Sequence, residues 1–206
     1  MAGIAESIRK SLQDYEQGDI EFSMMHACNA IDGTSRKLFP EIRKAGLRFT
    51  RAIRDNYDLL GPLAMPGINL DTTRWPISVV GARPEEPRPD AADLIYGIHR
   101  CTHGHGDDLP EGFQLIAEAN TDSDTVTTKV KSGSVQLSDC TIFALLTIAV
   151  LSPTNANLKV PGDFYLTFRK QTYLINEWWG RKDEYLQSIP LILMPSVHLN
   201  IPESWP

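Results

Sequence analysis

Apolar residues recur every three or four positions over much of the chain, and this spacing predicts amphipathic helices. Caps and stops divide the pattern: Asp19 is a favoured N-cap residue, Pro40 ends the helix before it, and Gly61-Pro62 ends the next one. Six helices are expected, over residues 4–18, 19–39, 41–60, 89–104, 138–151 and 162–189. The predicted fold class is therefore mainly α, a helical bundle.

A small β insertion interrupts the helices at residues 112–137. Alternating and β-branched residues predict strands over 113–119, 125–131 and 135–137. Ser132-Gly133 suits a tight turn between the last two, so we expect an antiparallel β-hairpin there. Two proline-rich stretches are predicted to lack regular structure, namely the connection over 61–89 and the tail over 190–206.

Composition favours one globular domain spanning residues 1–206. Hydrophobic residues make up 42% of the chain and charged residues 22%, so it can bury a core. The 3 cysteines are an odd number and are widely spaced, which predicts a reducing compartment, the cytoplasm, rather than a disulfide framework. The longest apolar stretch, residues 140–151, is too short to span a bilayer, so no membrane association is expected.

The candidate chemistry lies in the helix expected over 89–104. One face of this helix collects polar side chains at positions i, i+3, i+7 and i+10: Asp93, Tyr96, Arg100 and His103. His105 follows Gly104, a good helix terminator, where the chain can turn it back toward Arg100.

Arginine near histidine suits phosphoryl chemistry. A guanidinium is charged at any biological pH and binds phosphate with two hydrogen bonds, while imidazole exchanges a proton near neutrality. With RNA, a histidine can deprotonate a 2′-hydroxyl for attack on the adjacent phosphorus, and the arginine stabilises the developing charge. This chemistry needs no metal and no other cofactor.

The segment Leu94–His105, LIYGIHRCTHGH, followed by DLPEG at 108–112, resembles the signature region of HEPN-domain proteins, in which an arginine precedes a histidine by four to six residues late in a helix. Residues 27–37 resemble the long preceding helix of a HEPN subgroup with a β-hairpin. The resemblance implies a homodimer in which two Arg/His pairs share one cleft. It also implies a metal-independent endoribonuclease, a hydrolase with Arg100 on the scissile phosphate and His105 as general acid and base.

Other interpretations of this segment stay open. Arg100 and His105 can simply be cations that bind carbonyls at a helix end. A HEPN-like module can also bind RNA, a nucleotide or a protein without catalysis. His99 and His103 have the i, i+4 spacing of metal ligands, and His105 can add a third, but the cysteines lack zinc-ligand spacing. The main hypothesis therefore includes no metal.

Two further polar groups are candidates for binding RNA or for supporting the Arg100 site. The helix expected over 19–39 carries a polar stripe with Asn29, Asp32 and Arg36. From Arg36 to Arg54 the chain has seven basic residues and one acid, in a protein whose net charge is -6. Within this run Lys44, Arg48 and Arg51 share one helix face, which predicts a phosphate-binding surface, although both groups can equally be solvated helix faces.

Overall fold

A computed structural model describes residues 3–79, 88–104, 112–119, 126–131, 133–168, 170–189 and 196–199, with the backbone alone for 98–104. The helices within these ranges are α1 (Ile4–Glu16), α2 (Ile20–Leu38), α3 (Ala45–Arg54), α4 (Tyr57–Ala64), α5 (Ala91–Gly104), α6 (Cys140–Leu151), α7 (Ile175–Trp178) and α8 (Lys182–Ser188), with a 3-10 turn at Pro153–Asn155. The strands are β1 (Phe113–Ile116), β2 (Lys129–Lys131), β3 (Ser134–Ser138), β4 (Tyr165–Phe168) and β5 (Gln171–Leu174).

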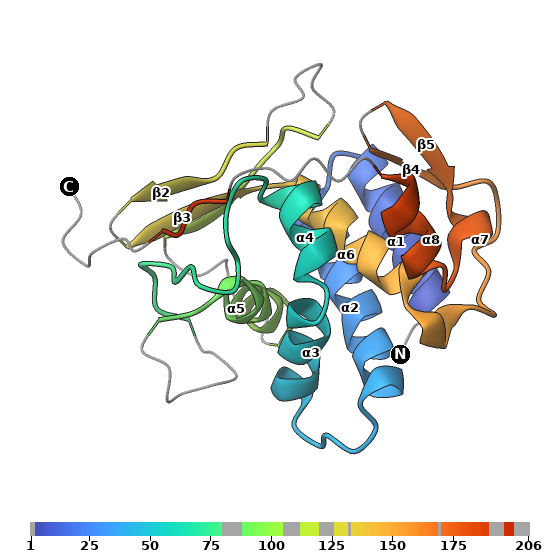
Figure 1. The fold of residues 1–206 in the computed structure, drawn as a ribbon, viewed down its shortest axis with the longest axis horizontal. Coiled ribbons are helices and arrows are strands. Elements are labelled where there is room, and N and C mark those ends of the chain that lie inside the picture. The colour runs from blue at the N-terminus through green and yellow to red at the C-terminus, as the bar shows by residue number, and fades with distance from the viewer. Residues whose placement is uncertain are drawn as a thin grey trace.

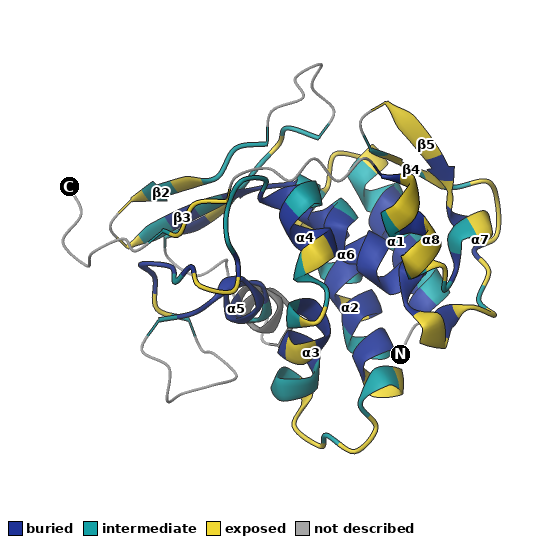
Figure 2. Cartoon of the chain, viewed as in Figure 1, coloured by how far each residue is buried: buried dark blue, intermediate teal, exposed yellow. Residues whose placement is uncertain are grey.

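Helix α6 lies at the centre of the molecule. It is apolar on every side, and ten of its 12 residues are buried, as expected for a helix with no solvent face. It packs against α2 and α4, and α1 packs along α2 (Figures 1 and 2). The sequence prediction of a mainly α protein is therefore confirmed.

Four of the six predicted helices form close to their expected bounds, as α1, α2, α5 and α6. Asp19 is the N-cap of α2, and its carboxylate accepts a hydrogen bond from the Phe22 N–H at 3.3 Å. Helix α5 is described as far as Gly104, the expected terminator. An apolar period marks α1, α2 and α5, an almost continuous apolar run marks α6, and aspartate side chains cap α2 and α5.

The single helix predicted over 41–60 is wrong, because two helices, α3 and α4, occupy the region. The break falls at Asn56, whose side-chain amide donates to the Ala52 carbonyl at 2.8 Å and so occupies an acceptor at the end of α3. Helix α4 then continues through Gly61 and Pro62 to Ala64. The irregular connection therefore begins at Met65 instead of residue 61.

The helix predicted over 162–189 is also wrong. Strands β4 and β5 form an antiparallel hairpin there, followed by the short helices α7 and α8. Gly162, Lys170 and Gly180 all have positive φ, at 94°, 65° and 75°, a left-handed conformation that cannot continue an α-helix. Of the aromatic residues in the predicted helical stripe, Phe168 lies in β4, Phe164 directly precedes this strand and Trp179 follows α7.

The β insertion is a three-stranded sheet in the order β1-β3-β2. The predicted antiparallel hairpin is present as β2 and β3, with Lys131 opposite Ser134 and Gly133 in the turn at φ 69°. Strand β1 adds to the other edge of β3 in parallel, which the sequence did not predict. In the tail, Val197 pairs with Ile68 through an isolated bridge, so part of the predicted irregular segment is held by backbone hydrogen bonds.

Helix α5 packs against α3 and α2. The absence of a side chain at Gly46 lets the Tyr96 ring approach α3 closely, and a Cβ there would lie 2.7 Å from Tyr96 Cζ. The Tyr96 ring also contacts Phe49, with 5.5 Å between ring centroids. Close packing at one glycine therefore sets the separation of the two helices.

We predict that Gly46→Ala lowers the free energy of unfolding by about 1–3 kcal/mol, because the methyl group collides with the Tyr96 ring. This loss occurs although alanine favours a helix over glycine by about 1 kcal/mol. Urea unfolding measures it, and the same substitution in a Tyr96→Leu background serves as the control. Equal effects of Gly46→Ala in both backgrounds would contradict the contact.

Candidate functional site

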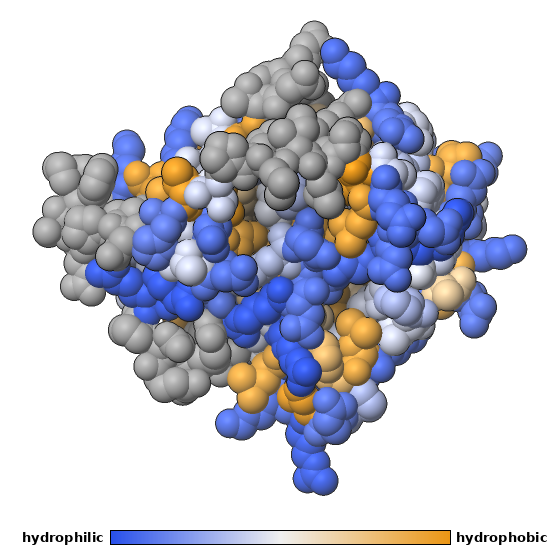
Figure 3. Space-filling model, in the orientation of Figure 1, coloured by the Kyte–Doolittle hydropathy of each residue, from blue (hydrophilic) through white to orange (hydrophobic). Residues whose placement is uncertain are grey.

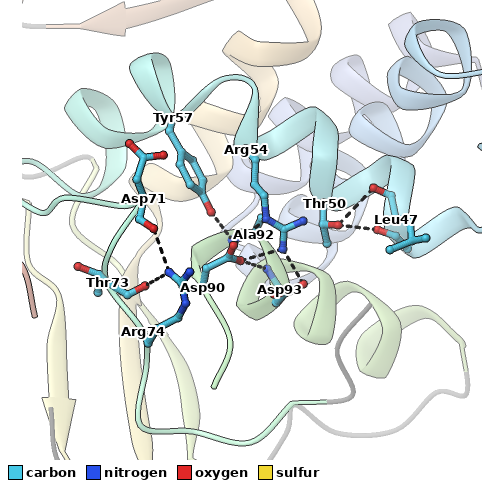
Figure 4. A network of polar contacts seen from close by, with 11 residues as sticks. Leu47, Thr50, Arg54, Tyr57, Asp71, Thr73, Arg74, Asp90, Ala92 and Asp93 are labelled. Atoms are coloured by element: carbon cyan, nitrogen blue, oxygen red, sulfur yellow. Dashed lines mark hydrogen bonds and ion pairs between the residues drawn. The ribbon is translucent and has the colours of Figure 1, made fainter. Parts of the chain in front are cut away.

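Arg54 at the end of α3 binds two aspartates at the start of α5 (Figure 4). Its Nε lies 2.6 Å from Asp90 Oδ2, and its Nη2 lies 3.1 Å from Asp90 Oδ1 and 2.8 Å from Asp93 Oδ1. The carboxylates are only 5% and 3% exposed. Arg54, Asp90 and Asp93 are called the Arg54 cluster below. The Arg54 guanidinium thus binds two carboxylates that have almost no access to water.

The Arg54 cluster also caps α5. Asp90 accepts a hydrogen bond from the Asp93 N–H at 2.8 Å, and the Tyr57 hydroxyl accepts one from the Ala92 N–H at 3.2 Å. Two N–H groups at the start of the helix are therefore satisfied by side chains. Burial raises the pKa of Tyr57, so its phenol stays neutral and keeps its proton.

Arg54 remains cationic in this environment. Burial by itself lowers the pKa of the guanidinium, but the hydrogen bond and charge of Asp90, together with Asp93, outweigh it and raise the pKa overall. The same Asp90 carboxylate therefore caps α5 and binds α3. This double role fixes the position of α5 along its own axis.

Contacts between α3 and α5 run in opposite order along the two helices. Asp93 meets Arg54 at the end of α3, and Tyr96, one turn later on α5, meets Gly46 and Phe49 near its beginning. Position 100 follows Asp93 by seven residues, which is about 20° short of two full turns. Position 100 therefore lies on nearly the same face of α5 as Asp93.

The side chains of Arg100 and His103, and the whole of His105, lie outside the described residues. Of the polar face predicted on this helix, the structure describes Asp93 and Tyr96. Both contact α3, so their described contacts fix α5 instead of lining an open cleft.

A second polar group joins α2 and α3. Asp32 on α2 binds Arg36 one turn further on, and it also lies 3.3 Å from Nη2 of Arg48 on α3. Arg48 is 13% exposed and donates a further hydrogen bond to the Arg43 carbonyl at 3.3 Å. Asp32 thus holds two of the predicted phosphate-binding arginines in place.

The remaining predicted binding residues are more exposed. Arg51 lies with its guanidinium carbon 4.5 Å from the centroid of the Phe39 ring, and its Nε lies 3.6 Å from Asp55 Oδ2. Lys44 and Asn29 are exposed, and within the described ranges Lys44 makes no ion pair. Lys44 is therefore a cation available to a ligand.

The predicted site residues divide between two sides of α3. Arg51 stands about 140° around the helix from Gly46 and about 160° from Phe49, which contact α5, and about 60° from Arg54, whose long side chain also reaches α5. Arg48 likewise stands about 160° from Gly46. The described residues therefore form two polar groups, one with α5 and one with α2, and not the single cluster that the sequence suggested.

Sequence reasoning missed Arg54 as an anchor for α5. The pair Asp90-x-x-Asp93 is a recognisable helix start, since aspartate is favoured at the N-cap and in the first turn. No short sequence pattern identifies the cation that binds these aspartates, because Arg54 is 36 residues away from Asp90 along the chain.

Neither a metal site nor a membrane span is found in the part of the chain that the structure describes. No three His, Cys, Asp or Glu side chains there are grouped to hold a metal ion, but His99, His103 and His105 fall outside that search. No helix among the described residues is both long and apolar enough to cross a bilayer.

These features define a mainly helical protein with a small mixed sheet, in which a buried arginine cluster anchors one helix to another. The chain belongs to the Rv1289 family, whose model matches residues 3–205. It is 34% identical over 202 residues to the uncharacterized proteins Rv1289 of Mycobacterium tuberculosis (strain H37Rv) and Mb1320 of Mycobacterium bovis. The match covers 98% of this chain and 95% of each relative. No solved structure matches the chain.

We predict that Arg54→Met lowers the free energy of unfolding by about 3–5 kcal/mol, because two buried carboxylates both lose their ion pair with Arg54. Urea denaturation at neutral pH measures the change. Arg51→Met, the same substitution at an exposed position of the same helix, is the matched control and should cost about 0.5 kcal/mol. Similar losses of unfolding free energy for the two variants would show that the Arg54 cluster stabilises the fold no more than an exposed arginine does.

Proposed function

We propose that the protein is a HEPN-like, metal-independent endoribonuclease that acts as a homodimer. Arg100 binds the scissile phosphate, and His105 acts as general acid and base. The observation that carries this proposal is that α5 is helical through position 100 and is bound to α3 by Arg54. Arg100 therefore belongs to an anchored helix, and His105 follows it by five positions in the sequence, as the Arg-x4-His pattern requires.

The proposed reaction needs only the RNA and two imidazoles. A neutral histidine accepts the proton of the 2′-hydroxyl, and the 2′-oxygen forms a bond to the adjacent phosphorus. The bond from phosphorus to the 5′-oxygen breaks, and a protonated histidine donates its proton to that oxygen. The products are a 2′,3′-cyclic phosphate and a 5′-hydroxyl. A two-fold dimer supplies one histidine from each copy.

Firm anchoring of α5 supports this chemistry. Catalytic groups lose much of their effect when they are displaced by about 1 Å, so the helix that carries them has to be fixed. Asp90 and Asp93 hold the start of α5 through Arg54, and Tyr96 packs it against α3. Each of these contacts lies on the helix before position 100.

Binding of RNA without cleavage is the second candidate function. The exposed Lys44 and Arg51 favour it, because they can contact phosphates without any contribution from Arg100 or His105. On this alternative, binding would weaken steeply with salt and no product would form.

We predict that the purified protein cleaves single-stranded RNA in the presence of EDTA and that His105→Ala lowers the rate by about 100-fold or more, because the proton-transferring group is lost. Gel analysis of labelled RNA measures cleavage, and circular dichroism checks folding. His198→Ala, the same change at an exposed histidine, is the control and should retain full activity.

Cleavage that persists in folded His105→Ala protein, or that EDTA abolishes, would refute the proposed mechanism. Salt-sensitive RNA binding with no cleavage by the wild type would leave the non-catalytic module as the function.

A further inference from the structure

We infer that Arg51 and Phe39 form a stacking platform for an unpaired nucleobase, which makes single-stranded RNA the ligand class. This inference rests on the proposed function for its biological context. The platform itself lies on the side of α3 that carries Arg51, called the outer side below. Nothing in it depends on the side chains of Arg100 or His105.

Arg51 is held over the Phe39 ring. The guanidinium carbon lies 4.5 Å from the ring centroid, within the range of a cation–π contact. Phe39 is the C-cap residue of α2, is only partly exposed and packs against the hydrophobic core. A rigid aromatic base therefore supports one side of the guanidinium.

The Arg51 side chain remains accessible to solvent. It is 53% exposed although it contacts Phe39 and also approaches Asp55, with 3.6 Å from Nε to Oδ2. A flat cation that contacts one ring and is still half exposed has surface left on which a second aromatic ring can stack. Because Phe39 already restrains the side chain, stacking costs less conformational entropy than on a free arginine.

Nucleobases suit such a surface. Proteins that bind single-stranded nucleic acid stack bases on aromatic rings and on arginine planes, and every base has a suitable face. Bases in a duplex are already stacked on their neighbours and expose only their edges. The platform therefore distinguishes an unpaired strand from a duplex.

Cations for the flanking phosphates lie on the same side of α3. Lys44 is the exposed N-cap residue of α3, about 10 Å from the level of Arg51 along the helix axis. Arg48 stands between them and is held by Asp32. In this row the platform can bind a base, and Arg48 and Lys44 can bind the phosphates beside it. The order matches the alternation of bases and phosphates along a strand.

The visible surface is mixed in character. On the face shown in Figure 3, hydrophobic residues form several separate patches among hydrophilic residues. Such a surface offers little area to an apolar partner. Charge complementarity at Lys44, Arg48 and Arg51 favours an anionic strand instead.

The test separates stacking from charge. Arg51→Lys keeps the positive charge but removes the planar guanidinium. Fluorescence anisotropy measures binding of a labelled oligouridine of about ten nucleotides, and of an abasic strand of equal length, to the full chain carrying His105→Ala, which prevents turnover. Arg43→Lys is the matched control. Arg43 is exposed directly before Lys44 in the sequence, and it makes no ring contact with another described residue.

We expect Arg51→Lys to weaken oligouridine binding roughly 5- to 100-fold, as for loss of one stacked base, and to leave the abasic strand unchanged. Phe39→Leu should give a smaller loss in the same direction, while Arg43→Lys should change neither affinity. Equal weakening for both strands, or an abasic strand bound as tightly as oligouridine by the parent protein, would overturn the platform. If the expected pattern appears but the wild type cleaves no RNA, the platform stands and the nuclease proposal fails.

Discussion

Burial of two carboxylates between α3 and α5 is the constraint on which the candidate site depends. Asp90 and Asp93 are nearly inaccessible to water, and Arg54 reaches both of their ionised carboxylates and compensates their charge. The same Asp90 carboxylate caps α5. A shift of α5 would therefore disturb the ion pairs of Asp90 and Asp93 with Arg54. These ion pairs fix the position at which α5 begins.

Helix α3 shows how the environment gives different roles to the same residue type. Arg54 and Arg51 are three positions apart, yet Arg54 joins two helices through buried carboxylates while Arg51 lies exposed over an aromatic ring. The side of α3 that packs against α5 stabilises the fold, and the side that carries Arg51 presents positive charge to a ligand. The proposed RNA contacts on the outer side are therefore compatible with a tightly packed inner side.

Much of the helical framework could be predicted from the sequence, because α1, α2 and α5 have an apolar period and α6 is an almost continuous apolar run. The predicted helix over 162–189 failed because Phe164, Phe168 and Ile175 fit a helical period by chance. Backbone with positive φ at Gly162 and Lys170 excludes a helix there, and only the glycine signals this in the sequence.

The candidate site could be predicted only in part. The Asp32–Arg36 pair follows from i, i+4 spacing and is present. The partners of Asp93 and Arg48 come from other helices, so no local pattern reveals them. The roles of Arg100 and His105 stay a prediction.

Native-state hydrogen exchange of the wild type and of Asp93→Asn tests most directly whether the buried charges fix α5 on α3. The account predicts that the amides of α5 over residues 91–97 and those of α3 lose protection together in the variant, while amides of α1 and α6 keep theirs. Unchanged protection of α5, or a uniform loss across all helices, would contradict the claim that the Arg54 cluster positions this helix.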